Sequence, residues 1–418
     1  MLVQFTVGNF LSFNQKRTLS LEAKGISELK TNIANFKGGK ILRSSVVYGA
    51  NSSGKSNLIK AMQKMRDVVL TSVRLNDSDE LDYHPFLLST ETENKPTFFE
   101  IVFWLDSIKY RYGFEYTLKQ ITNEWLFAGK TEKPLFIRTL DGIGITEKFR
   151  EGKGSISKTN ENRLFVSLVA QLGGNISKKI LEFFNNYNVL SGLEHNDYTG
   201  FTMRMLHKNL YGSDESIKLY QKLKLGFQDI KAVEADFNPL EISGDIPENI
   251  RARIIKDLTG KKSLSLKTVH CKFGKKGQFV EFIHLDKEKN ESEGTKKIID
   301  LSGPIFDTLK LGKVLIVDEL EAKLHPLITM RIVELFNNPV SNSNNAQLIF
   351  ATHDTNLLGE ELFRRDQIWF TEKDEHEQTD LYSLYDFILP KGSKVRNDSN
   401  LERNYIRGRY GAIPFITN

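Results

Sequence analysis

One short stretch of the chain has the residue types that are needed to hold a phosphate group. Residues 49–56 fit the pattern G-x-x-x-x-G-K-[ST], in which backbone N–H groups and the positive end of the next helix surround a phosphate. Gly49 and Gly54 allow a close approach that a Cβ would disfavour. Lys55 can reach the β- and γ-phosphates of a nucleotide, and the Ser56 hydroxyl can bind Mg²⁺. The predicted nucleotide-binding residues are Gly49, Asn51, Ser52, Ser53, Gly54, Lys55, Ser56 and Asn57.

The residues on either side of this loop fit a strand before it and a helix after it. Residues 45–48 form a short run typical of a buried strand. After the loop, apolar residues recur at helical spacing at Leu58, Met62, Met65 and Val69. A glycine-rich surface loop that matched the pattern by chance would not require these flanks. Strand, loop and helix in this order are the context that a phosphate-binding loop needs.

A second group of candidate functional residues follows an apolar strand late in the chain. Residues 314–317 are apolar, and Asp318 and Glu319 come directly after them, which is the Walker B pattern. We expect Asp318 to hold Mg²⁺ through water together with Ser56, and Glu319 to orient and deprotonate the attacking water. Taken alone, a strand that ends in solvated acids is common. Its place after a phosphate loop favours the catalytic interpretation.

A histidine ends the next apolar strand. Residues 347–351 are apolar except for Gln347, and Thr352 and His353 follow them. A histidine at this position can donate a hydrogen bond to a γ-phosphate or position the attacking water. A single histidine is more often structural, but its place at the end of this strand favours a catalytic role. The predicted catalytic residues are therefore Lys55, Glu319 and His353.

The elements that must position these residues alternate between strands and helices. Residues 98–104 and 108–114 predict a hairpin around Asp106 and Ser107. We expect a first ATPase lobe at 1–154, a mostly helical insertion at 155–260, a second lobe at 261–390 and a basic, irregular tail at 391–418. Within the second lobe, residues 264–273 and 279–285 predict two strands joined by a lysine-rich turn.

Composition places the chain among ordinary globular proteins. It has 418 residues, of which 39% are hydrophobic and 27% are charged. No apolar run approaches the length of a membrane span, and the N-terminus lacks the layout of a signal peptide. Cys271 is the only cysteine, which excludes a disulfide framework and a cysteine-based zinc site. We therefore expect a cytoplasmic protein that does not bind membranes.

The charge of the chain leaves nucleic-acid binding open. The formal net charge is +5, which permits contact with nucleic acid without arguing for it. Lysines gather around the predicted late hairpin, and they fit either solvated charge or a phosphate-binding patch. These lysines are Lys261, Lys262, Lys267, Lys272, Lys275 and Lys276.

Together the motifs resemble the ATPase head of ABC-type proteins. The resemblance rests on residues 49–56, 292–294, 318–319, 324–326 and 351–353. Its relatives are the chromosome-maintenance and RecF-like proteins and the AAA-type ATPases of bacterial anti-phage and abortive-infection systems. The opening at 9–13 and the ending at 407–414 resemble the last group most closely. The resemblance implies an α/β fold, a P-loop NTPase head with a mixed sheet, a strand-rich lobe and a helical insertion, with ATP and Mg²⁺ as cofactors.

The resemblance also implies a dimer, or a higher homo-oligomer, that sandwiches ATP. The phosphate loop of one subunit would face Ser292 and Gly294 of the other, whose N–H groups begin a helix. Glu291 and Glu293 depart from the usual signature, which argues against fast cycling.

The resemblance finally implies a role in defence. The chain shows no second catalytic centre, so the expected role is an ATP-hydrolysing sensor or regulator that controls a separate toxic effector such as a nuclease. One alternative is a RecF-like clamp that binds DNA, and another is a scaffold that binds ATP and hardly hydrolyses it. The clamp predicts binding to DNA that weakens steeply with salt.

Overall fold

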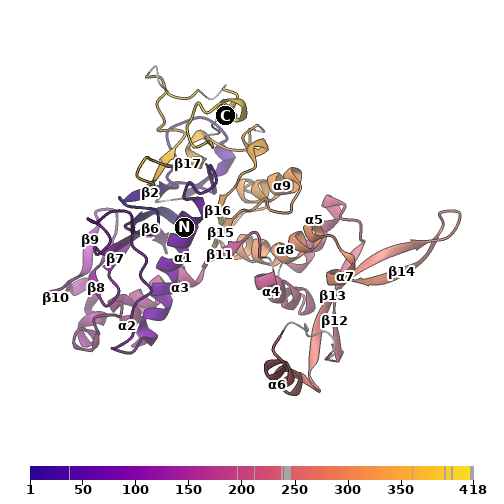
Figure 1. Cartoon of the computed structure of the whole chain (residues 1–418), viewed down its shortest axis with the longest axis horizontal. Helices are drawn as coiled ribbons and strands as arrows, with labels where there is room; N and C mark the ends of the chain where they lie inside the picture. Colours follow the sequence, from indigo (N-terminus) through magenta and orange to yellow (C-terminus); the bar gives the residue numbers. More distant parts are fainter. Residues whose placement is uncertain are drawn as a thin grey trace. The chain divides into compact units, whose positions relative to one another are not determined.

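The computed structural model describes residues 1–414 except 37, 195, 211, 237–238, 240–245, 360, 390–391 and 397–398. The chain forms two compact units, one made of residues 1–193 and 308–418 and the other of residues 194–307. Figure 1 shows the elements of both units, and each unit is described here by itself.

The described part of the first unit contains a six-stranded sheet that carries the phosphate loop. In spatial order its strands are β11 (Tyr187–Ser191), β15 (Val314–Asp318), β16 (Gln347–Ala351), β5 (Ser44–Gly49), β17 (Ile368–Lys373) and β18 (Thr379–Ser383). Neighbouring strands run parallel except β17 and β18. Every residue of β5 and β16 is buried, as expected for a parallel sheet covered on both faces. The carboxyl ends of the parallel strands therefore meet at one edge, where ligands bind in open α/β sheets.

A seven-stranded antiparallel sheet forms the strand-rich lobe among the described residues. In spatial order its strands are β10 (Gly142–Ile145), β9 (Lys133–Thr139), β8 (Ile121–Ala128), β7 (Ile108–Tyr116), β6 (Thr97–Leu105), β1 (Leu2–Gly8) and β2 (Arg17–Ser20). The predicted hairpin turn is present, and Asp106 and Ser107 have φ values of 48° and 65°. A separate pair consists of β3 (Ile33–Phe36) and β4 (Gly39–Leu42). The structure therefore confirms the predicted α/β fold with a mixed sheet and a strand-rich lobe.

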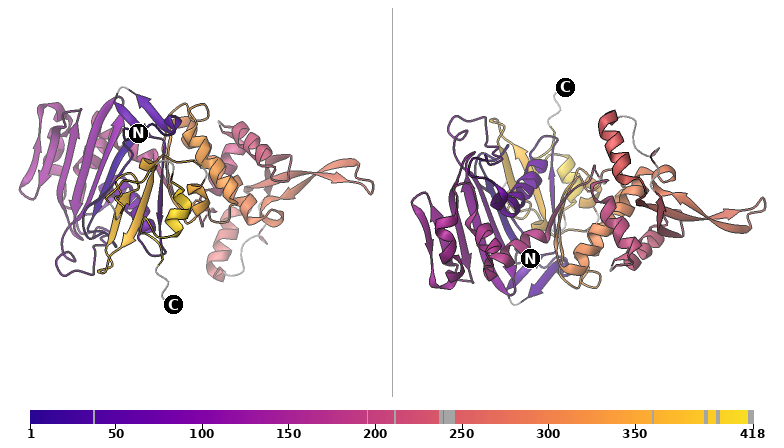
Figure 2. Two further views of the ribbon diagram at one scale, coloured as in Figure 1. Left: turned by 90° about the horizontal axis from the view of Figure 1, so that it is seen from above. Right: turned by 90° about the horizontal axis from the view of Figure 1, so that it is seen from below.

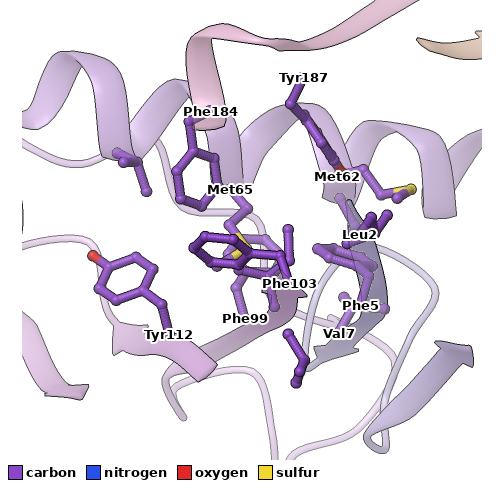
Figure 3. Packing of buried hydrophobic residues seen from close by; sticks show 14 of the residues in the cluster. Leu2, Phe5, Val7, Met62, Met65, Phe99, Phe103, Tyr112, Phe184 and Tyr187 are labelled. Carbon is purple, nitrogen blue, oxygen red and sulfur yellow. The ribbon is translucent and has the colours of Figure 1, made fainter. Parts of the chain in front are cut away.

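Helices join the two sheets of the first unit into one core. The helix α1 (Lys55–Thr71) contacts β1 of one sheet and β5, β15 and β16 of the other. Figure 3 shows Met62 and Met65 of α1 beside Phe5, Phe99 and Phe103 of the strand-rich lobe. The remaining helices of this unit are α2 (Phe165–Gln171), α3 (Asn175–Asn185), α9 (Pro326–Asn337), α10 (Leu401–Ile406) and the 3₁₀ helices η1 (Lys30–Asn32), η2 (Ser72–Arg74), η3 (Glu147–Lys158), η5 (Thr355–Leu358) and η6 (Arg365–Gln367).

The second unit combines helices with a three-stranded antiparallel sheet in its described residues. Its elements are α4 (Asn196–His207), α5 (Ser213–Leu223), β12 (Asp229–Asp236), α6 (Glu248–Leu258), β13 (Lys262–Phe273), β14 (Phe279–Asp286), α7 (Lys287–Asn290) and α8 (Glu293–Leu311), which ends in the first unit. Its small core contains Tyr220, Phe227, Ile230, Leu266 and Ile299. Figure 2 shows that the β13–β14 hairpin extends beyond the helices of its own unit.

The boundaries of the units differ from the predicted domains. The sequence predicted an insertion at 155–260, whereas the separate unit spans residues 194–307. The helices α2 and α3 stay with the first unit because Ile180, Phe183 and Phe184 are buried in its main core. The second unit includes β13 and β14, because Ile230 and Leu266 share its small core and β13 pairs with β12.

The C-terminal segment also differs from the irregular tail that was predicted for 391–418. Part of it is helical, in α10, and Tyr405 and Tyr410 are buried. The two rings pack on Phe370 of β17, with centroid distances of 5.4 and 6.0 Å. Aromatic packing therefore holds this basic segment against the parallel sheet.

Candidate functional site

The phosphate loop lies between β5 and α1, and its two glycines are required by close packing. A Cβ on Gly49 would lie 2.6 Å from the Thr371 carbonyl oxygen. Gly54 has a φ of +110°, and a Cβ there would collide with the Thr379 side chain. Ser52 also has a positive φ, of 62°. The loop therefore has the unusual backbone that lets N–H groups converge on an anion.

Side chains from distant parts of the chain hold the loop in place. The hydroxyls of Ser53 and Thr371 lie 2.7 Å apart, and Thr379 donates to the Ser53 carbonyl at 3.0 Å. The Ser12 hydroxyl accepts from the Asn57 amide at 2.7 Å and lies 2.7 Å from the Thr379 hydroxyl, to which it can donate. The side chains of the predicted residues Ser53 and Asn57 thus bond to protein groups. Thr371 and Thr379 were missed because no local pattern marks them, and Ser12 lies in the 9–13 segment, which supported the resemblance but was given no role at the loop.

Lys55 is buried within the loop. Its Nζ donates to the carbonyl oxygens of Gly49 at 2.8 Å and Ala50 at 3.0 Å. Burial lowers the pKa of Lys55 to about 8, although the carboxylates of Asp318, Glu321 and Glu319 oppose this shift. Burial therefore makes the charged form of Lys55 less favourable, and a phosphate group bound beside it would stabilise that charged form.

Asp318 ends β15 at the same sheet edge and has an oxygen that suits a cation. Its Oδ1 is buried and accepts no hydrogen bond from the described residues. A buried carboxylate oxygen without a partner costs free energy unless water or a metal ion contacts it. Oxygen ligands of this kind are those that Mg²⁺ prefers. Asp318 fits the predicted role, with Ser56 available in the first turn of α1.

Glu319 leaves the strand in a different direction from Asp318. Its φ of 52° lies in the left-handed region, which a glutamate rarely adopts. The end of β11 fixes this turn, since the Gly192 N–H donates to the Asp318 carbonyl at 2.7 Å. A Cβ on Gly192 would collide with the Glu319 carbonyl oxygen. The two adjacent carboxylates are therefore separated by the backbone and can take different roles.

His353 follows β16 and is linked to a carboxylate that the sequence interpretation missed. Its backbone N–H donates to Oε1 of Glu321 at 2.6 Å. The Oε2 of Glu321 is buried and has no hydrogen-bond partner among the described residues. Glu321 also influences the pKa of Lys55. Its place two residues after Glu319 was the only signal in the sequence.

The charges around His353 set its protonation state. Partial desolvation lowers the pKa of His353, and the ammonium of Lys55 lowers it further, while Glu321, Glu319 and Asp318 oppose the shift. The imidazole is therefore neutral at pH 7 and can donate from one nitrogen while accepting at the other.

Ser292 and Gly294, which are predicted to face the phosphate loop of a partner subunit, lie in the second unit. Ser292 precedes α8, and its Oγ accepts from the Thr295 N–H at 3.1 Å. The carboxylate of Glu291 accepts from the Thr268 hydroxyl at 2.6 Å and contacts His270 at 3.0 Å. Glu291 therefore fastens the start of α8 to β13. The contribution of Ser292 and Gly294 to a nucleotide in a partner subunit stays a prediction.

The first unit thus brings most of the predicted residues together. The loop with Lys55, the carboxylates Asp318 and Glu319, and His353 occupy one end of the parallel sheet. This arrangement can bind a polyphosphate and a divalent cation, and it offers a carboxylate and a neutral imidazole to a water molecule. Among the described residues, no helix is both long and apolar enough to cross a membrane.

Comparison with known structures finds distant similarity along most of the chain. The Smc head bound to the C-winged helix domain of ScpA is 13% identical, with a TM-score of 0.45, and the match covers 91% of this chain and 97% of that one. The SMC head domain from Thermotoga maritima is 12% identical, with a TM-score of 0.39, and the match covers 91% and 98%. No curated protein matches the chain.

Comparison with protein families gives a match over residues 44–359. The family is described as "AAA domain, putative AbiEii toxin, Type IV TA system". The matched range begins with β5 and includes the phosphate loop, Asp318, Glu319 and His353. The chain therefore belongs to this AbiEii-type family of AAA ATPase domains.

Proposed function

We propose that the protein is an Mg²⁺-dependent ATPase that acts as the sensor or regulator of a bacterial anti-phage system. The observation that carries the ATPase activity is the meeting of Lys55, Asp318, Glu319 and His353 at one edge of the sheet. The family match supports the ATPase class and an association with toxin systems. Control of a separate toxic effector is the finer part of the proposal.

Each site residue has a role that follows from its chemistry. The loop N–H groups and Lys55 bind the phosphates of ATP, and Ser56 and Asp318 would hold Mg²⁺, which neutralises charge on the phosphate oxygens when bound. Glu319 orients the attacking water and accepts its proton. His353, neutral at pH 7, donates a hydrogen bond to the transferred phosphoryl group, and Glu321 fixes the backbone of His353.

The test of this activity is ATP binding and turnover by the purified full chain. Lys55→Ala should abolish detectable ATP binding, because the buried ammonium is the loop's own positive charge. Glu319→Gln should keep ATP affinity and lower turnover by about 10²- to 10⁴-fold, the usual contribution of a general base. Normal hydrolysis by Glu319→Gln would refute the assignment of Glu319. Slow turnover by the unaltered chain would favour a scaffold that only binds ATP.

We further propose that ATP brings two subunits together in a dimer, or more subunits in a higher homo-oligomer. In a sandwich of this kind, Ser292 and Gly294 of one subunit complete the site of the other. Light scattering of Glu319→Gln should show a larger mass with ATP and Mg²⁺ than without them. Gly294→Trp should block this increase without preventing ATP binding, whereas Gly200→Trp, at an open position in α4, should not.

The regulatory role requires a partner with its own toxic activity. Tagged Glu319→Gln, purified from its host with ATP, should carry a stoichiometric protein that is toxic when expressed alone. Cells that hold both proteins should restrict phage, and Lys55→Ala should remove this protection. Recovery of nuclease-sensitive DNA without a protein partner would instead favour a DNA-binding clamp.

A further inference from the structure

The end of the β13–β14 hairpin exposes aromatic rings that its own unit does not use. The exposed fractions are 62% for Phe273, 52% for Phe279 and 57% for Phe282. The base of the same hairpin is different, because Leu266 and Val269 are buried there. Exposed apolar area gathered at one place marks a contact surface more often than scattered apolar residues do.

The pairing of the strands collects these rings in one place. Phe273 pairs with Phe279 across the hairpin, and Cys271 pairs with Phe282. The ring centroids of Phe279 and Phe282 lie 5.0 Å apart, with the planes tilted by 58°. The tip, residues 271–282, therefore presents a cluster of ring faces and edges. Figure 1 shows the hairpin beyond the other elements of its unit.

The charge of the tip is positive. Residues 271–282 contain three lysines and one acidic residue. That residue, Glu281, is neutralised by Lys272, whose Nζ lies 2.6 Å from its carboxylate. Lys275 and Lys276 lie in the turn that joins the strands. The tip therefore combines phenyl rings with a pair of lysines whose charge complements phosphate.

We propose that this tip binds single-stranded nucleic acid. Unpaired bases stack on aromatic side chains while lysines contact the phosphates, a combination that needs no particular sequence. A duplex hides its bases and would use only the lysines. The proposal goes beyond the proposed ATPase and would give a defence sensor a surface for nucleic acid.

The test measures fluorescence anisotropy of labelled 20-nucleotide oligothymidine, oligouridine and a duplex of the same length with the full chain. At least one of the two single strands should bind the protein more tightly than the duplex does. Phe273→Leu with Phe282→Leu should weaken binding by at least about tenfold, because leucine keeps apolar area and cannot stack. Lys275→Gln with Lys276→Gln should lower the slope of log affinity against log salt by about 1.4.

Matched controls separate this surface from general effects. Leu140→Ala, which removes an exposed apolar side chain from the strand-rich lobe, should not change binding. Lys148→Gln with Lys153→Gln removes two exposed lysines from η3 and should not change it either. Phe282→Trp should bind normally and show quenched tryptophan fluorescence when bases stack on the ring. Lys55→Ala should keep full oligonucleotide affinity, so failure of the ATPase proposal would leave this result unaffected.

Three outcomes would overturn the proposal. One is equal affinity for single strands and duplex, with no loss in the leucine pair. Another is no oligonucleotide binding, with Phe273→Ala and Phe282→Ala lowering the mass of the assembly, which would assign the tip to self-association. The third is no oligonucleotide binding, with tip-dependent binding to vesicles of anionic phospholipid, which would assign it to a membrane surface.

Discussion

The nucleotide site and the hairpin tip leave opposite kinds of surface unsatisfied. At the nucleotide site, buried polar atoms such as Asp318 Oδ1 and Glu321 Oε2 lack partners among the described residues. At the hairpin tip, large apolar rings such as Phe273 and Phe282 are exposed to water. A small charged ligand requires desolvated polar groups held rigidly, whereas a long flexible ligand requires accessible rings and mobile charges. Each surface therefore indicates the chemistry of its ligand by what the fold leaves without a contact.

The largest expected effect comes from adding one methyl group to a glycine in each of the two regions. Gly54→Ala should lower ATP affinity by at least about 10²-fold, because its Cβ would collide with Thr379 and displace loop N–H groups. Gly277→Ala, in the turn of the hairpin, also has a positive φ, of +77°, but its Cβ would meet nothing within 4 Å. It should cost about 1 kcal/mol of stability and leave ATP binding unchanged. Titration with a fluorescent nucleotide and urea unfolding measure both.

Substitution of Glu321 should have the next largest effect, on kcat. It tests whether this carboxylate acts by positioning the backbone of His353. Glu321→Ala removes the acceptor of the His353 N–H and should lower kcat by about tenfold. Glu321→Gln keeps an acceptor oxygen and should lower kcat less, with ATP affinity near normal in both. Steady-state kinetics decides the matter. Unchanged kcat in the alanine variant would make Glu321 a structural residue only.

A smaller effect is expected from pH. The pKa of Lys55 is lowered to about 8, so the ammonium that binds phosphate loses its proton as pH rises through that value. ATP binds the charged form, and its affinity should fall by up to about tenfold per pH unit above 8. Measurement of Kd from pH 7.5 to 9.5 should show this bend. A flat profile would show that carboxylates near Lys55 keep it charged.

The smallest effect is expected on stability at the hairpin tip. Phe273→Ala should change the free energy of unfolding by no more than about 0.5 kcal/mol, because its ring is exposed. Phe103→Ala in the main core should cost about 3–5 kcal/mol, because its buried ring stacks on Phe183 with a centroid distance of 4.0 Å. Urea unfolding compares the two variants. A large loss in Phe273→Ala would mean that the tip packs within the fold.

The sequence predicted features whose cause is local. Gly49, Asp318 and His353 could be predicted to lie together because each ends or closely follows a short buried strand, and parallel strands bring such ends to one edge. Glu321 and Thr379 could not, because their roles depend on contacts formed only in the folded chain. The limits of the second unit could not be predicted either, because they depend on which core buries α3.

The contacts of Ser12 and Thr379 with the phosphate loop have a consequence for protein synthesis. These two residues are 367 positions apart and lie 2.7 Å from each other, and Thr379 also bonds to the Ser53 carbonyl. The loop itself is translated early, but the residue that steadies it emerges late. A ribosome must therefore translate the chain as far as β18 before the loop can gain these contacts. A fragment released before β18 would carry the phosphate-binding sequence without the Thr379 contact that holds the loop at Ser53.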